Sequence, residues 1–337
     1  MKCIRTNNLR IGYTDQIIAS DINLSLKQGQ LVALIGRNGI GKSTLINTIT
    51  GKLPYISGSI MIHNKNLSSF SNNQLAKQVA FVPSRLPIAS NITLFELVAM
   101  GRYPYTNWIG KLKRNDKFIV NQAIKQTGLE SYAEKMIYQL SDGTKQKAMI
   151  AKALAQETPL IILDEPLSHL DIVNKYEVAD LLLELVEEKD KAIMYSTHDL
   201  QLAIDTAHLT WILTDNELIE GAPEDLVLQG AFDKITKGSD LQFSVSEGNF
   251  TKIVKADGSS FFIQNDTKEA SWVTRALKKN GFISVDNKNE ASYVIQVIKG
   301  MGTIEYYVEK GGEQNHFFRI EDLVLFLINT DKNKKYE

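Results

Sequence analysis

The chain has 337 residues, 43% of them hydrophobic and 23% charged, a composition that can bury the cores of one large domain or two smaller ones. The formal net charge of −1 excludes a bulk electrostatic attraction to nucleic acid or to an anionic lipid surface. The single cysteine, Cys3, excludes an internal disulfide framework and fits a reducing cytosol, and it is expected to be an ordinary residue of the first strand.

We expect neither a signal peptide nor a membrane-spanning segment. The N-terminal stretch MKCIRTNNLRIGY lacks an apolar core of signal-peptide length, and no run approaches 18 uninterrupted apolar residues. Any role at a membrane must therefore pass through a partner protein.

The first quarter of the chain alternates short apolar runs with Asn, Asp and Gly turns, which predicts strands. The continuous apolar stretch at 29–36 is typical of a strand buried on both faces of a sheet. A helix is expected at 42–53, ended by Gly51 and then Pro54. The other expectations are strands at 4–13, 17–26 and 77–84 and a hairpin at 58–67.

Helical apolar spacing over about 91–156 predicts a helical insert. Beyond it, strands are expected at 159–166 and 192–199, with a long helix at 171–189 between them and a hairpin at 209–221 that turns at 215–216. Because strands alternate with helices, the fold class is predicted to be α/β with a mostly parallel sheet.

The pattern changes near Gly238, and 238–337 is predicted to be a small accessory α+β domain, regulatory or dimer-stabilising. The expected elements are short strands within 241–265 with turns at 247–249 and 257–258, a helix at 268–282, strands at 292–300 and 303–311 joined at 299–302, a helix at 320–329 and a solvated tail at 330–337. His316 is expected to be an ordinary strand residue. The helical stripe expected to face the core comprises Trp272, Val273, Ala276 and Leu277.

The stretch GRNGIGKST fits the phosphate-binding P-loop pattern, and it lies between a predicted strand and a predicted helix. Its glycines permit positive φ, so successive backbone N–H groups can converge on phosphate oxygens at the positive end of the helix dipole. Lys42 is expected to neutralise the β- and γ-phosphates of ATP, and Ser43 to ligate Mg²⁺. The predicted ATP-binding loop comprises Gly36, Arg37, Asn38, Gly39, Ile40, Gly41, Lys42, Ser43 and Thr44.

Two carboxylates end the buried strand at 160–166. Asp164 is predicted to complete the Mg²⁺ shell with Ser43, and Glu165 to polarise a water for attack on the γ-phosphate. His198 follows the next strand, which should lie beside the Asp164 strand, so we expect it to bond the γ-phosphate and orient that water. Glu165 and His198 are thus the predicted catalytic residues.

The stretch YQLSDGTKQK offers a second anion clamp at the start of a predicted helix. Ser141 supplies a hydroxyl at an N-cap position, and the N–H of Gly143 can meet an anion. In a head-to-tail homodimer this turn can close the side of ATP that the partner's P-loop leaves bare.

Together these motifs resemble those of ATP-binding cassette (ABC) ATPases. The P-loop, LSDGTKQK, LIILDEP, SHLD and STHD occur in that family's order and spacing across about 2–235. The resemblance implies a P-loop NTPase cassette at 1–237, in which a mixed-sheet core carries an antiparallel β subdomain and a helical subdomain. It also implies that Tyr13 stacks on adenine, that Ser141, Asp142 and Gly143 act in trans, and that Asp171 links the two sites of the dimer.

The stretch ITLFELVAMGRYPYTNW is similar to ATPases that power import of ferric siderophores, haem and cobalamin. This resemblance implies a cytoplasmic subunit, peripheral on the inner face of the cell membrane, under an integral-membrane permease dimer. A substrate-binding protein would be an indirect partner. The permease is expected to contact the Q-loop at 79–87 and GRYPYT at 101–106. Iron-siderophore is the first expectation for the cargo, with haem or cobalamin next.

Three positions depart from the family pattern. Ser84 stands where the Q-loop has a glutamine, and its shorter side chain reaches metal or water only through a bridging water. Asp142 occupies a glycine position of the signature, and Thr144 replaces the usual glutamine or glutamate. We therefore expect slower turnover than in a consensus cassette.

Two other functions fit part of the pattern. Ser84 and Thr144 also suit a switch that dimerises on ATP, hydrolyses it slowly and acts through the C-terminal domain. A DNA-repair or chromosome ATPase shares the clamp but carries long coiled coils, and the stretch between Lys42 and Ser141 has no sustained heptads. An importer ATPase that uses ATP and Mg²⁺ is the leading prediction.

Overall fold

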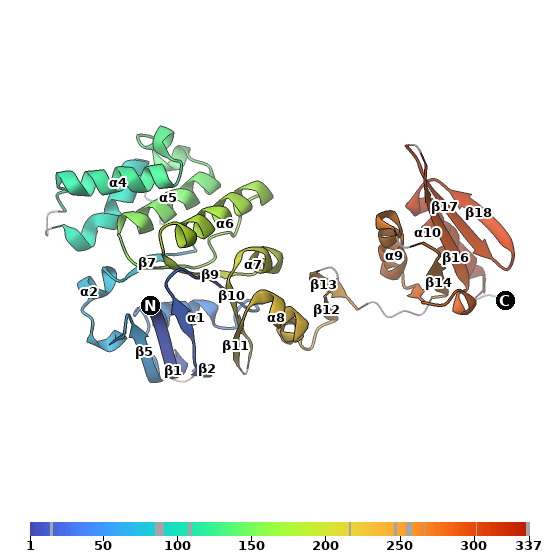
Figure 1. Cartoon of the computed structure of the whole chain (residues 1–337), viewed down its shortest axis with the longest axis horizontal. Coiled ribbons are helices and arrows are strands. Elements are labelled where there is room, and N and C mark those ends of the chain that lie inside the picture. Colours follow the sequence, from blue (N-terminus) through green and yellow to red (C-terminus); the bar gives the residue numbers. More distant parts are fainter. Residues whose placement is uncertain are drawn as a thin grey trace. The chain divides into compact units, whose positions relative to one another are not determined.

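The computed structural model describes residues 1–13, 16–84, 91–106, 110–215, 217–245, 248–253, 258–265, 267–300 and 302–334 (Figure 1). The chain separates into two compact units. The first contains Met1–Ser239 and Phe243–Phe250, and the second contains Asp240–Gln242 and Thr251–Glu337. None of the helices within the described residues is long and apolar enough to cross a membrane.

An antiparallel sheet is formed by the N-terminal strands. Strand β1 (Lys2–Tyr13) pairs with β2 (Gln16–Ile22), β3 (Ser25–Lys27) and β5 (Ser57–Ile62), and β5 pairs with β6 (Lys65–Asn66). His63 and Asn64, between β5 and β6, have φ of 46° and 63°, the left-handed values that a tight hairpin turn requires. The predicted hairpin is confirmed, and Cys3 is a buried strand residue as expected.

A second, six-stranded sheet has the order β11-β10-β4-β9-β8-β7, and all its pairs are parallel except β10–β11. The predicted mixed sheet is therefore present. Because parallel strands share one direction, the residues that follow β4, β7, β8 and β9 gather at one edge. The strand bounds are β4 (Leu31–Ile35), β7 (Val79–Val82), β8 (Leu160–Leu163), β9 (Ala192–Thr197), β10 (Leu209–Leu213) and β11 (Leu218–Gly221).

Both faces of this sheet are covered. Along β4, Val32 and Leu34 pack in one core with α1 (Lys42–Ile49) and the antiparallel sheet, whereas Leu31 and Ala33 pack in a second core with α6 (Ile172–Glu187). This alternation follows the two-residue period of a strand and explains why β4 is apolar throughout. Two shorter helices, α7 (Leu200–Thr206) and α8 (Pro223–Leu228), follow β9 and β11.

The predicted helical insert is confirmed. Helix α5 (Asp142–Ala155) packs against both α3 (Leu94–Ala99) and α4 (Arg114–Gln126), and these helices form the green layer of Figure 1. A short helix, α2 (Asn72–Ala76), precedes β7. The segments at 85–90 and 107–109 lie outside the described residues. The expected permease contact at 79–87 is therefore described only as far as Ser84, whereas the one at 101–106 lies wholly within the described residues.

Arg102 fixes the GRYPYT segment to this helical layer instead of facing solvent. Its side chain is 4% exposed, its Nε lies 3.0 Å from Asp116 Oδ1, and its Nη1 lies 2.7 Å from Glu157 Oε2. The Tyr105 hydroxyl donates to the Gln156 carbonyl, and Tyr103 is exposed. Of the two tyrosines in this motif, Tyr103 is therefore the one with a largely free surface.

The second unit is α+β, as predicted. Its sheet has the order β15-β14-β16-β17-β18, and one face packs on the buried side of α9 (Lys268–Lys279) and on α10 (Ile320–Lys334). The strand bounds are β14 (Ser260–Ile263), β15 (Ile283–Ser284), β16 (Tyr293–Lys299), β17 (Ile304–Lys310) and β18 (Glu313–Phe317). His316 lies in a strand, as expected.

Two expectations for this part are wrong. Trp272 is 60% exposed, because only Val273 and Leu277 of its helical stripe lie on the fully buried line of α9 and Ala276 is partly buried. The first part of the expected solvated tail, 330–334, continues α10, and Asp331 accepts hydrogen bonds from Ser259 and from the Tyr293 hydroxyl, whereas 335–337 lies outside the described residues.

A strand pair lies near the predicted domain boundary. Strands β12 (Leu241–Ser244) and β13 (Asn249–Lys252) pair, and Phe243 and Phe250 pack with Phe232 of the first unit. The boundary placed between 237 and 238 remains a prediction. The turn positions at 216, 247, 257 and 301 lie outside the described residues.

Candidate functional site

The P-loop joins β4 to α1 and is shaped by its glycines. Gly39 and Gly41 have φ of 81° and 113°, and a Cβ on Gly41 would lie 2.2 Å from Ile18 Cγ2 of β2. A larger residue at Gly41 would therefore be strained and would clash. Tyr13 ends β1 and pairs with Gln16, so it belongs to the hairpin whose second strand packs on the P-loop, and it is 54% exposed.

Lys42 is buried beneath this loop. Its ammonium group donates to the carbonyl oxygens of Gly36, at 2.8 Å, and Arg37, at 3.2 Å. Burial lowers the pKa of Lys42, and the negative charges of Glu165 and Asp164 oppose that decrease. The ammonium thus lies among acceptors and carboxylates, where an incoming phosphate would find a partly desolvated positive charge.

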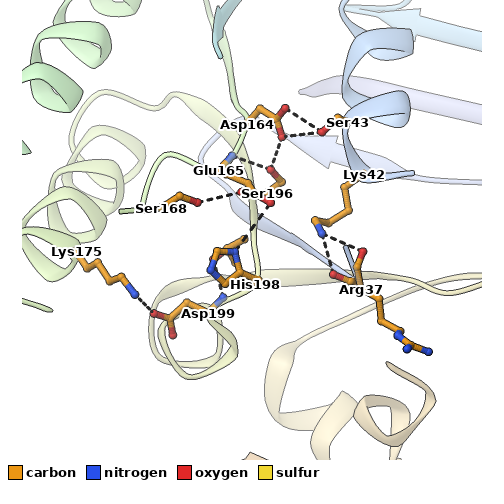
Figure 2. A network of polar contacts seen from close by, with 12 residues as sticks. Arg37, Lys42, Ser43, Asp164, Glu165, Ser168, Lys175, Ser196, His198 and Asp199 are labelled. Carbon is orange, nitrogen blue, oxygen red and sulfur yellow. Dashed lines mark hydrogen bonds and ion pairs between the residues drawn. The ribbon is translucent and has the colours of Figure 1, made fainter. Parts of the chain in front are cut away.

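Asp164 links the first turn of α1 to strand β9, as Figure 2 shows. The Ser43 hydroxyl donates to Asp164 Oδ2 at 3.0 Å, and the Ser196 hydroxyl donates to Oδ1 at 2.7 Å. Ser43 lies in the first turn of α1, Asp164 follows β8, and Ser196 lies in the neighbouring β9. The predicted pairing of the Asp164 strand with the His198 strand is confirmed. Because β9 also pairs with β4, which leads into α1, Ser43 and Asp164 come together.

Glu165 is held in an uncommon backbone conformation. Its φ is 49°, in the left-handed region that non-glycine residues rarely adopt, and its N–H donates to Ser196 Oγ at 2.8 Å. Ser168 donates to Oε2 at 3.0 Å, while Oε1 lies 4.0 Å from His198 Nδ1. The two predicted catalytic side chains are therefore neighbours, and one Glu165 oxygen is left facing the histidine.

The segment after His198 is fixed by an ion pair. Lys175, in the first turns of α6, lies 2.9 Å from Asp199 Oδ2, and Figure 2 shows this pair beside the site. The Asp199 carboxylate also accepts from the N–H of Leu202 at the start of α7. These contacts hold the chain just beyond His198, whose own side chain is 56% exposed.

Ser141 caps α5, as predicted. Its Oγ accepts from the N–H of Thr144 at 3.2 Å and lies 2.8 Å from the Thr144 hydroxyl. Asp142 points outward, with 72% of its side chain exposed, and Lys145 lies 3.2 Å from its Oδ1. The extra negative charge of this signature thus has a positive neighbour on the same helix.

Gly143 packs directly against the start of α6. A Cβ there would lie 2.4 Å from Asn174 Oδ1, and Asn174 donates through Nδ2 to Asp171 Oδ2 at 2.7 Å. Asp171 is the N-cap of α6, since its Oδ1 also accepts from the N–H of Asn174. The predicted coupling residue and the signature glycine therefore meet through one asparagine.

Ser84 follows β7, which pairs with β8 so that Val82 lies opposite Leu163. Ser84 is exposed at the same sheet edge as Asp164.

Three further residues of the predicted ATP-binding loop differ in burial. Asn38 is exposed, Thr44 is buried, and Ile40 packs against the neighbouring core. The roles assigned to these residues remain predictions.

Three residues of the site were not predicted from the sequence: Ser168, Asn174 and Ser196. Ser196 had a visible signal, because it is a hydroxyl residue in an otherwise largely apolar strand directly before His198. Ser168 and Asn174 had none beyond being polar residues near Glu165 and Asp171, because their partners depend on how the chain turns.

Comparison with known proteins agrees with this geometry. The ABC transporter family model matches residues 19–168, and the iron ABC transporter C-terminal domain model matches 258–328. The petrobactin import ATP-binding protein FpuD of Bacillus anthracis is 36% identical over 227 residues, 67% of this chain and 83% of FpuD. The iron(3+)-hydroxamate import ATP-binding protein FhuC of Bacillus subtilis is 36% identical over 220 residues, 65% of this chain and 82% of FhuC.

A solved structure shares the fold of the first unit. It is the dimeric ATP-binding cassette MJ0796 in a post-hydrolysis state with ADP and phosphate, at 25% identity and a TM-score of 0.57, covering 65% of this chain and 98% of that one. The expected cassette fold is confirmed. This chain therefore belongs to the family of ABC transporter ATP-binding proteins, which are transport ATPases.

Proposed function

We propose that this protein is the ATP-hydrolysing subunit of an importer for ferric siderophores, working as a homodimer on the cytoplasmic face of a permease. Support comes from relatives that are named as petrobactin and iron(3+)-hydroxamate import proteins, and from the match to an iron ABC transporter C-terminal domain. The observation that carries the catalytic part is the convergence of Lys42, Asp164 and Glu165 at one sheet edge (Figure 2).

Magnesium fits the residues at this edge. Ser43 Oγ lies 3.0 and 3.4 Å from the two Asp164 oxygens, and a hydroxyl with a carboxylate is a donor set that Mg²⁺ prefers. Ser43 and Asp164 would hold the ion, which when bound would offset the negative charge of the phosphate oxygens.

Lys42 and the P-loop bind the triphosphate. The ammonium group now satisfies the Gly36 and Arg37 carbonyls, and phosphate oxygens can take their place as acceptors. Because burial disfavours the charged ammonium, an anionic partner offsets part of the lost solvation.

Glu165 is the base for the attacking water in this proposal. Its Oε2 is held by Ser168, so Oε1, on the His198 side, is the oxygen that accepts the proton. His198 positions the water and the γ-phosphate. The left-handed backbone and the Ser196 hydrogen bond hold Glu165 in place before substrate arrives.

Import can be tested in cells that lack this protein. Uptake of radioactive iron supplied as a ferric siderophore is expected to return with the wild-type chain and to stay at background with Glu165→Gln. Haem and cobalamin supplied separately serve as comparison cargoes. Uptake of one of these, with none of the ferric siderophore, would overturn the cargo while leaving the ATPase assignment intact.

Two alternative functions are not favoured. A slowly hydrolysing switch would suit Ser84 and the Thr144–Ser141 contact. The named relatives, however, are import proteins. Because these relatives are import proteins, a DNA-repair or chromosome ATPase is not favoured either. ATPase turnover can be measured in lipid with the permease present. A rate that stays at the slow basal level would favour the switch over the importer.

A further inference from the structure

The face of the C-terminal sheet opposite α9 and α10 carries three potential metal ligands. Along β17, Tyr306 and Val308 point into the core, so Glu305 and Tyr307 point to the opposite face. His316 of β18 is directly opposite Tyr307 in the antiparallel register, and its side chain shares that face.

The polar ends of these three side chains meet at one atom. The Tyr307 hydroxyl donates to Glu305 Oε2 at 2.6 Å, and His316 Nε2 lies 3.3 Å from the same oxygen. The Tyr307 and His316 rings stack, with centroids 4.4 Å apart and planes 10° apart. Phe318 packs edge-on against His316, with ring centroids 4.5 Å apart. The stacking holds a phenol oxygen and an imidazole nitrogen on the same side of one carboxylate.

We propose that Glu305, Tyr307 and His316 bind a ferric ion. A carboxylate and a phenolate are hard anionic oxygen donors, which a small trivalent cation prefers, and imidazole is a common ligand of iron. Ligand–metal distances of about 2.0–2.2 Å require donor atoms about 3 Å apart, and the two separations at Glu305 Oε2 are close to that value.

Binding exchanges a proton for the metal. The Tyr307 phenol loses its proton to solvent, and the resulting Fe–O bond replaces the hydrogen bond to Glu305. The carboxylate and the imidazole then each contribute a lone pair. The side chains of Glu305 and His316 are 30% and 35% exposed, so the ion can reach the cluster. Three protein donors leave coordination positions for water or for a small chelator. The site is separate from the P-loop chemistry and does not depend on the proposed cargo.

The full-length protein can be tested with ferric nitrilotriacetate, in the absence of nucleotide and followed by desalting. We expect retained iron and a visible charge-transfer band from phenolate to iron, which carboxylate or imidazole ligands alone do not produce. Tyr307→Phe should abolish the band, while Glu305→Gln and His316→Gln should weaken iron binding about tenfold or more. Tyr306→Phe, the same change on the opposite face of β17, should leave both unchanged.

Three results would overturn the proposal. They are the absence of a band and of retained iron in the wild type, an unchanged band in Tyr307→Phe, and retention of Zn²⁺ from zinc sulfate under conditions in which ferric ion is not retained. Circular dichroism and ATP binding of each variant report whether the fold and the P-loop are intact, so a loss of iron in a variant that passes both is a loss of the ligand.

Discussion

Glu165 combines an uncommon backbone angle with two hydrogen-bonding hydroxyls. A φ of 49° costs free energy in a residue with a Cβ, and the Ser196 and Ser168 contacts offset that cost. Strained backbone conformations of this kind cluster at active sites, where they direct a side chain toward a reacting atom. The conformation therefore supports Glu165, rather than its neighbour Asp164, as the base.

Replacement of Glu165 by Gln is expected to lower steady-state ATP hydrolysis about 10²-fold or more, because the amide cannot accept the water's proton. ATP binding should be retained, since Lys42 and Ser43 are untouched. Phosphate release and nucleotide binding are the measurements. Ser168→Ala, which frees Oε2 but keeps the carboxylate, should cost less activity, and the reverse order would contradict the assignment of the base.

Ser84 is expected to limit turnover, because its hydroxyl is shorter than the glutamine amide of the family pattern. Ser84→Gln should raise the ATPase rate several-fold at saturating Mg·ATP. Ser84→Asn, with an amide one carbon shorter, is the matched control. If restoring the glutamine brings no gain, Ser84 does not account for slow turnover.

At the scale of secondary-structure elements, the start of α5 and the start of α6 are in contact through Gly143 and Asn174. Gly143→Ala places a Cβ against the asparagine, and the displaced amide loses its bond to Asp171. We expect a loss of about 1–3 kcal/mol in the free energy of unfolding. Urea denaturation measures it, and adding Asn174→Ala should recover most of the loss. If Asn174→Ala does not restore the free energy of unfolding, the loss does not arise from contact between the new Cβ and Asn174.

The Arg102 network joins the 3₁₀ turn after α3 to α4 and to the end of α5. Asp116→Asn removes one charge of a buried pair, so we expect the unfolding free energy to fall by about 3 kcal/mol. Asp142→Asn, the same change in an exposed pair, should cost under about 1 kcal/mol. Urea denaturation measures both changes. If the two substitutions lower the free energy of unfolding equally, the buried Arg102–Asp116 pair is no more important to stability than the exposed one.

The same pair gives stability a defined pH dependence. Burial alone would raise the pKa of Asp116, but hydrogen bonds from the Lys113 N–H and from Arg102 outweigh it and hold the pKa below 3.8. Its contribution is therefore present above the unfolded value of 3.8 and is lost as pH falls through the lower folded pKa. The Asp116→Asn variant should lack this acid-dependent loss.

At the scale of the whole molecule, each chain carries both a P-loop and a Ser141–Gly143 turn. We propose that these two parts bind different ATP molecules, so that each ATP is held by the P-loop of one chain and the turn of its partner. The Glu165→Gln variant is therefore expected to dimerise in Mg·ATP and to remain monomeric without nucleotide. Adding Ser141→Arg should prevent dimerisation, because the bulky cation occupies the turn that faces the partner's ATP. Light scattering after size exclusion measures both states.

A monomer that persists in excess Mg·ATP, even with the permease present, would contradict this arrangement. The dimeric form of the MJ0796 cassette makes the expectation reasonable for a chain with the same fold. The iron-binding experiment on the C-terminal sheet is independent of this result.

Local sequence was enough to predict the nucleotide-binding motifs and a mostly parallel sheet, and the order and spacing of these motifs carried the resemblance to ABC cassettes. The P-loop, the carboxylates after β8 and the N-cap at Ser141 are short motifs whose chemistry is carried by adjacent residues, and alternating strands and helices indicated the parallel sheet. These motifs can be predicted because their geometry depends on residues that are adjacent in the sequence.

Tertiary structure alone decided which distant side chains meet. Ser196 joins Asp164 and Glu165 because β9 pairs with β8, and Asn174 contacts Gly143 because α5 packs on α6. Trp272 is exposed because the sheet covers only one line of α9, and Glu305, Tyr307 and His316 converge through the register of β17 and β18. The physical reason is that each of these contacts depends on a pairing or packing choice made far away in the chain, which no local pattern encodes.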